Sequence, residues 1–183
     1  MKRKGHRRKT KLAVVGSAVQ WGSRAAKLAR ELGREIAVRD CVLVTGATTG
    51  LTYEAVKGAK ERRGFVLGIS PAANEQEHVK GYGKPVEGFD LIVFTGVGLI
   101  GRNSTIVRTA DAVLVVGGQA GTLNEFTTAS VEGKVIGVLK GSGQIAEMLG
   151  KIAEVCGVPK DRLIFEREPA RLVAKILQRI KKG

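Results

Sequence analysis

The segment from Asp111 to Glu125 most constrains the fold of this chain. It begins with the apolar run 112–116, which is rich in valine and too short for a helix, so it predicts a buried strand. A glycine-rich turn follows, with Gly117, Gly118 and Gly121. Glycine there lets the backbone approach a ligand closely. Thr122 is then expected to cap a helix whose free N–H groups favour an anion in front of it.

Short apolar strands alternate with helical segments along the rest of the chain. The expected strands are 12–16, 41–45, 65–69, 91–95, 112–116, 135–139 and 163–165, and the expected helices are 23–38, 51–62, 102–109, 123–132, 143–155 and 169–181. This alternation predicts a mostly parallel sheet with helices on both faces, the doubly wound, Rossmann-like α/β class. With 183 residues and 43% hydrophobic content, the chain is expected to form one domain over residues 12–183.

Positive charge is concentrated at the start of the chain. The net charge is +14, and seven lysines and arginines lie within residues 1–11. These residues are expected to form a basic, mobile tail, for which contact with nucleic acid is an alternative but not the favoured interpretation. The apolar run that follows is interrupted by Gly16 and Ser17, so it predicts a strand and not a secretory signal. No run reaches the ~18 apolar residues of a membrane span, so no membrane partner is expected.

The cysteines and histidines do not form a metal-binding pattern. Cys41 and Cys156 lie far apart, and the chain has only 2 histidines. We therefore expect a reduced, cytoplasmic protein without a metal site, in which each cysteine fills the core. His78 lies in the polar segment 70–88, which is expected to be a long loop that covers a site, with the histidine exposed to solvent.

Four expected strand ends carry glycine or polar residues that suit a ligand site. They are Gly16 and Ser17, the turn 45–50 with Gly46 and Thr49, the segment 96–103 with Gly98, and the segment 117–125. Ligands of open parallel sheets bind at the carboxyl ends of the strands, so these segments are expected to converge on one crevice.

The segment 96–101 is a literal G-x-G-x-x-G between an expected strand and an expected helix. A dinucleotide site would also need an acidic residue about 20 positions further on, at the tip of the next strand. Here the next strand tip is Gly117-Gly118-Gln119. A nicotinamide cofactor is therefore not favoured, and the glycines equally suit a plain loop.

Thr122 and Glu125 also match the T-x-x-E capping box, in which both side chains bind only backbone N–H groups. Three further features favour a binding site instead. The glycines precede this pair, Arg102 and Asn103 open the previous helix, and Asp111 starts the strand between them.

The order Arg102, then Ala-Asp-Ala at 110–112, then Gly-Gly-x-x-Gly-Thr-x-x-Glu at 117–125 resembles the LOG family. The resemblance covers roughly residues 12–140. LOG proteins belong to a superfamily that includes molybdenum-cofactor carriers and DNA-processing proteins. They carry an Arg-Lys pair followed by Pro-Gly-Gly-x-Gly-Thr-x-x-Glu, and they cleave the N-glycosidic bond of cytokinin-type nucleoside monophosphates.

This resemblance implies a site and its chemistry. Arg102 and Glu125 correspond to the catalytic pair. The residues implied or expected to bind the phosphate or nucleotide are Gly16, Ser17, Gly46, Thr49, Gly98, Asn103, Gly117, Gly118, Gln119, Gly121 and Thr122. No cofactor is required for hydrolysis, and the resemblance implies a homo-oligomer.

The sequence departs from the LOG pattern at three positions. Asn103 replaces the lysine, Gly117 stands at the proline, and Gln119 stands at the second glycine. These departures are more similar to the branch near the molybdenum-cofactor carriers. Two interpretations therefore stay open: a nucleoside 5′-monophosphate phosphoribohydrolase, or a carrier or sensor of a nucleotide or molybdopterin-type ligand. A third, less favoured interpretation is single-stranded DNA binding, for which the chain offers few aromatic stacking residues.

Overall fold

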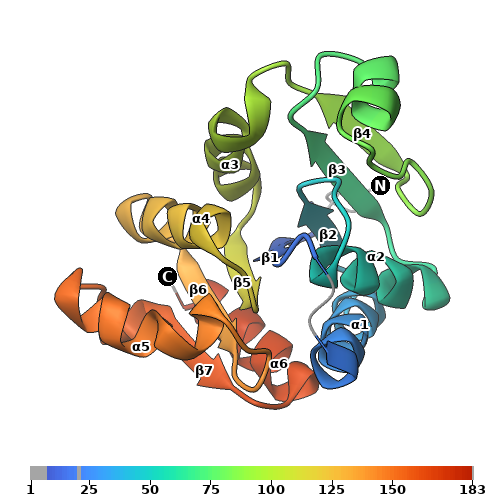
Figure 1. Ribbon diagram of the computed structural model, residues 1–183. Coiled ribbons are helices and arrows are strands. Elements are labelled where there is room, and N and C mark those ends of the chain that lie inside the picture. The colour runs from blue at the N-terminus through green and yellow to red at the C-terminus, as the bar shows by residue number, and fades with distance from the viewer. Residues whose placement is uncertain (1–7, 20–21, 183) are drawn as a thin grey trace, which may run out of the picture.

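The computed structural model describes residues 8–19 and 22–182, and these form one seven-stranded sheet (Figure 1). The strands are β1 (Lys11–Gly16), β2 (Val42–Thr45), β3 (Val66–Ser70), β4 (Leu91–Phe94), β5 (Ala112–Val116), β6 (Val135–Leu139) and β7 (Leu163–Glu166). Their order is β4-β3-β2-β1-β5-β6-β7, and every neighbouring pair is parallel. The predicted doubly wound α/β fold is confirmed.

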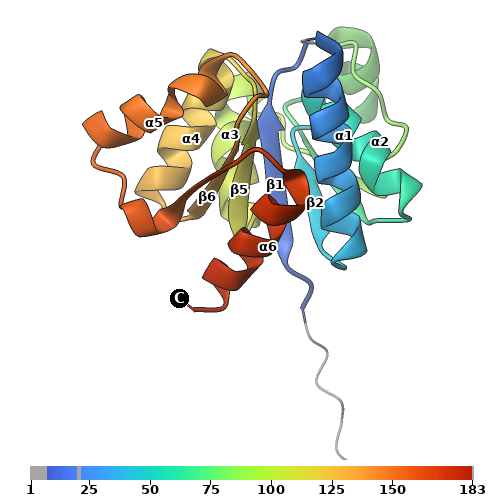
Figure 2. The same cartoon turned by 90° about the horizontal axis from the view of Figure 1, so that it is seen from below.

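Six α-helices cover both faces of this sheet in the described part of the chain. They are α1 (Gly22–Val38), α2 (Leu51–Glu61), α3 (Gly98–Thr109), α4 (Ala120–Val131), α5 (Ile145–Val155) and α6 (Pro169–Ile180). Helices α1, α2 and α6 pack on one face, and α3, α4 and α5 pack on the other (Figures 1 and 2). Successive side chains of a strand point to opposite faces, so in β1 Leu12 and Val14 join the first core layer while Ala13 and Val15 join the second.

Helices α1 and α2 lie unusually close together because a glycine on each faces the backbone of the other. A Cβ atom on Gly33 would lie 1.9 Å from the carbonyl oxygen of Ala55, and one on Gly58 would lie 1.8 Å from that of Arg30. Since real Cβ atoms do not approach so closely, neither position accepts a side chain without a shift of the helix pair.

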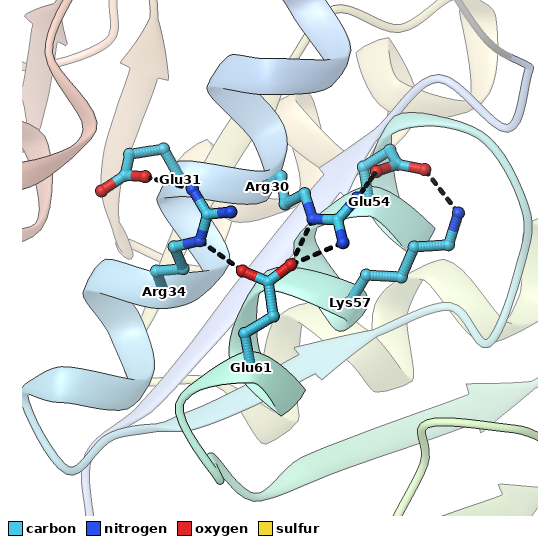
Figure 3. Close-up of polar contacts among 6 residues, drawn as sticks. All are labelled: Arg30, Glu31, Arg34, Glu54, Lys57 and Glu61. Atoms are coloured by element: carbon cyan, nitrogen blue, oxygen red, sulfur yellow. Dashed lines mark hydrogen bonds and ion pairs between the residues drawn. The ribbon is translucent and has the colours of Figure 1, made fainter.

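Ion pairs cross the outer surface of the same two helices (Figure 3). Glu61 of α2 accepts hydrogen bonds from the guanidinium groups of Arg30 and Arg34 on α1. These bonds lower the pKa of the Glu61 carboxyl. The cluster lies at the surface, where water and salt screen such pairs, so packing rather than charge carries most of the stability of this contact.

Four elements begin or form where the sequence did not predict them. Helix α3 begins at Gly98, one turn earlier than expected, and α4 begins at Ala120 instead of 123. The expected loop 70–88 contains a short π-helix, η1 (Glu77–Gly81), and a 3₁₀ turn, η2 (Lys160–Arg162), precedes β7. The earlier start of α3 and α4 brings their first turns toward the carboxyl edge of the sheet.

The expected boundary of the basic tail is one residue too late, because β1 begins at Lys11. Asp111 binds this segment: it accepts the backbone N–H of Lys11 at 2.8 Å and the guanidinium of Arg8 at 2.7 Å. Residues 1–7 of the expected tail lie outside the described residues. None of the described helices has the length and apolar content needed to cross a bilayer.

Two expectations about single side chains are wrong. Cys156 is exposed at the end of α5 rather than part of the core, whereas Cys41 is buried. His78, a residue of η1, is fully buried instead of solvated, and its ring packs edge-on against Phe94.

Candidate functional site

A cavity of about 290 Å³ opens at the carboxyl edge of the sheet, beside the ends of β1 and β5. These strands are adjacent, yet the chain runs outward from β1 to β4 before it returns at β5. This reversal is the topological switch point, where open α/β sheets bind their ligands. The volume lies at the lower end of the range of small-molecule sites, about 300–1,000 Å³.

Most of the candidate residues line this cavity, and they come from all four expected strand ends. They are Gly16, Ser17, Gly46, Arg102, Asn103, Gln119, Gly121, Thr122 and Glu125.

The remaining candidates lie just outside the cavity wall. Thr49 donates its hydroxyl to the carbonyl oxygen of Ala18 at 2.7 Å. Gly117 and Gly118 donate their N–H groups to Ser142 Oγ at 2.9 Å and Gln144 Oε1 at 2.8 Å, so they anchor the turn to the loop after β6. The fourth candidate, Gly98, is the first residue of α3, and its N–H donates a hydrogen bond to a carbonyl oxygen in the loop after β3.

The cavity also has lining residues that the sequence did not single out. Thr48 and Thr52 lie on either side of the predicted Thr49, and Leu99 and Ile100 come from the first turn of α3. Leu99 and Ile100 are 53% and 64% exposed, so they form an apolar lip rather than part of the core. Leu99 and Ile100 lie inside the G-x-G-x-x-G segment, so the sequence did carry a signal for them. Using that signal would have required knowing that α3 begins at Gly98.

Arg102 is the central cation of the cavity. It is only 9% exposed, its Nη1 donates to the carbonyl oxygen of Ile69 at 3.3 Å, and its buried Nε has no hydrogen-bond partner among the described residues. Gly46 makes room for it, since a Cβ there would lie 1.5 Å from Arg102 Nη1. Burial lowers the pKa of the guanidinium. With one hydrogen bond made among the described residues, the guanidinium has donors left, so a ligand acceptor in the cavity would stabilise it.

Glu125 is the acid of the cavity, and it is 7% exposed. Burial raises the pKa of its carboxyl to about 7, and the nearby Arg102 guanidinium opposes part of that rise. Among the described residues no ion pair within 4.0 Å joins the two side chains. A carboxyl that titrates near neutral pH can exchange a proton with a bound ligand or a water molecule.

The first turn of α4 faces the cavity without a cap. The structure has Gln119 at the N-cap and no hydrogen bond from its side chain, so Thr122 lies inside the helix and is not the predicted cap. No capping-box bond from Thr122 or Glu125 to backbone N–H groups is present in the described chain, so that alternative is wrong. The N–H groups at the start of α4 are left for a ligand, and the helix dipole favours an anion there.

A family model described as the SLOG cluster4 family matches residues 9–173. The chain belongs to this family. One relative, an uncharacterized protein of Archaeoglobus fulgidus, is 30% identical over 129 residues, which make up 70% of this chain and 79% of that protein. The matched range of the SLOG cluster4 model includes both Arg102 and Glu125.

Two solved structures extend this result. The molybdenum cofactor binding protein of Rippkaea orientalis is 27% identical, with a TM-score of 0.77, and the match covers 96% of this chain and 97% of that one. The molybdenum cofactor carrier protein of Chlamydomonas reinhardtii is 26% identical, with a TM-score of 0.75, over 95% and 99% of the two chains. This SLOG cluster4 protein is therefore similar, over nearly its whole length, to two solved molybdenum-cofactor-binding proteins.

Proposed function

We propose that the cavity binds a phosphate-bearing nucleotide or a nucleotide-derived cofactor of the molybdopterin type. The observation that carries this proposal is the Arg102 guanidinium, which lines the same cavity as the uncapped start of α4 and has, among the described residues, a single hydrogen bond, from Nη1 to Ile69. Both groups present N–H donors and positive potential, and a phosphate is the common biological group that satisfies both.

The rest of the ligand would lie against the other walls. The phosphate is held by Arg102 and by the N–H groups of Gly121 and Thr122, while Leu99 and Ile100 offer an apolar surface to a planar ring system. Asn103 is 3% exposed and donates from Nδ2 to Asn124 Oδ1 at 2.8 Å, so its carbonyl oxygen remains as an acceptor in the wall. A nucleoside monophosphate and a phosphorylated pterin share this combination of ring and phosphate.

A molybdenum cofactor, when bound to an enzyme, supplies redox chemistry at its metal. The described residues contain no cluster of three or more histidine, cysteine or carboxylate side chains that could hold a metal ion. The donors of the cavity suit the phosphate of such a cofactor rather than its metal, and this fits a role in carrying the intact group. The two similar solved structures, a molybdenum cofactor binding protein and a molybdenum cofactor carrier protein, support the same choice.

Hydrolysis of a nucleoside monophosphate is a second candidate, and it is favoured by one observation, the pKa of about 7 at Glu125. In that reaction the oxygen of water bonds to the anomeric carbon of the ribose as the bond from that carbon to the base nitrogen breaks. Ionised Glu125 would stabilise the positive charge that develops on the ribose, and the proton from water would end on the departing base.

A thermal-shift screen of nucleoside 5′-monophosphates, with the unphosphorylated nucleosides as controls, tests the binding proposal. A monophosphate at 100 times its dissociation constant should raise the stability by about 2.7 kcal/mol, and the nucleoside should raise it much less. Equal shifts for both sets would contradict a phosphate site. Release of free base from a bound monophosphate, abolished by Glu125→Gln, would add hydrolysis to binding, whereas binding without release would restrict the function to carriage or sensing.

A further inference from the structure

A second cation, Lys84, lies close to the same cavity but does not line it, and it comes from the segment between η1 and β4. Its Nζ donates to Thr49 Oγ1 at 3.4 Å, and that hydroxyl in turn binds the carbonyl oxygen of Ala18, which lines the cavity. In the described part of the chain, Lys84 has no carboxylate within 4.0 Å. The long distance to a neutral hydroxyl leaves most of its hydrogen-bonding capacity unused.

Lys84 and Arg102 share a region with little negative charge. Burial lowers the pKa of the Lys84 ammonium, and the charge of Arg102 lowers it further. The acid of the cavity, Glu125, is itself buried and has a pKa of about 7, so it offers at most one negative charge to the two cations. Two cations held together without matching acids are stabilised by a bound anion.

The segment that carries Lys84 is fixed by His78. Its Nε2 lies 3.1 Å from the carbonyl oxygen of Pro85, which can only accept, so Nε2 carries the proton. Its Nδ1 then accepts the hydroxyl of Ser70, at the end of β3, at 2.8 Å. The backbone N–H of Lys84 also binds the carbonyl oxygen of His78 at 3.1 Å. Lys84 therefore has a defined position relative to the sheet edge.

We propose that Lys84 and Arg102 together bind one dianionic phosphate monoester, and that they thereby select monoesters over phosphodiesters. This inference rests on the proposed function and specifies its ligand class. A terminal phosphate carries close to two negative charges at neutral pH, whereas a diester carries one, so two cations gain more from the monoester. A nucleoside 5′-monophosphate or a phosphorylated pterin meets this requirement, and a cyclic nucleotide does not.

The test compares Lys84→Met with the matched control Lys80→Met, which removes an exposed lysine from the neighbouring helix η1. AMP, cyclic AMP and adenosine serve as calorimetric probes of the unmodified protein and the two variants. We expect Lys84→Met to weaken AMP binding by about 10- to 100-fold, the usual value of a charge-assisted bond, with no change for adenosine. Lys80→Met should bind AMP like the unmodified protein, and Lys84→Arg should restore most of the affinity.

A second readout keeps the test independent of how well the variant folds. Acetylation of the lysines of the unmodified protein, followed by mass spectrometry, should show that AMP or inorganic pyrophosphate protects Lys84 and leaves Lys80 reactive. Unchanged AMP affinity in Lys84→Met, while the unmodified protein binds AMP, would overturn this inference and leave the proposed function intact. If no phosphate-bearing probe binds and none protects Lys84, both the inference and the proposed function are wrong.

Discussion

Replacing Glu125 by glutamine should make the protein more stable at alkaline pH. The ordinary pKa of a glutamate is 4.5, and burial raises that of Glu125 to about 7. Between these values the folded protein holds a proton that the unfolded chain has released, so the stability contributed by this group falls as the pH rises through that window. At about 1.4 kcal/mol per pKa unit, the loss between pH 4.5 and pH 8 is about 3 kcal/mol.

Glu125→Gln cannot ionise, so it escapes this loss. Relative to the unmodified protein, the melting temperature of the variant should rise between pH 5 and pH 8 by about 6–12 °C, since 1 kcal/mol corresponds to about 2–4 °C for a chain of this size. Differential scanning calorimetry in phosphate-free buffer measures the difference, with Glu75→Gln as the control at an exposed glutamate. A difference that is the same at both pH values would refute the claim that Glu125 is desolvated without a sufficient partner.

Three further substitutions separate binding from folding. Gly121→Ala should hold or raise the melting temperature while it weakens AMP binding in calorimetry, because a Cβ there meets no protein atom within 4 Å and would enter the ligand space. Arg102→Met should weaken AMP binding about 10- to 100-fold, whereas Arg108→Met on the exposed side of α3 should not; equal loss in both would point to a diffuse charge effect. Gly58→Ala should cost about 1–3 kcal/mol in denaturant unfolding by separating α1 from α2. Gly150→Ala, where a Cβ would lie 3.8 Å from Phe165, should cost nothing, and a similar loss in both would contradict the packing argument.

The strands were the most predictable part of this protein. The predicted ranges for β5 and β6 match the structure at both ends, because each is a run of apolar residues bounded by glycine or polar residues. The helix starts at Gly98 and Ala120 were missed, since neither has a capping side chain and tertiary contacts of the turns decide where the helix begins.

The site was predictable where it depends on strand ends and not where it depends on burial. The topology of parallel strands brings Arg102 and Glu125 to one edge whatever their environment. The pKa of Glu125 depends on how deeply α4 is buried beside Arg102, and the burial of His78 and the position of Lys84 depend on how the segment between β3 and β4 packs. No local pattern in the sequence reports that packing.

The central claim is that Arg102 and the start of α4 bind a phosphate, and an NMR titration of ¹⁵N-labelled protein tests it most directly. The account predicts that AMP shifts the Nε–H signal of Arg102 together with the amide signals of Gly121 and Thr122, and that adenosine at the same concentration leaves the Arg102 signal in place. If AMP binds while these three signals do not move, the phosphate lies elsewhere and the account is contradicted.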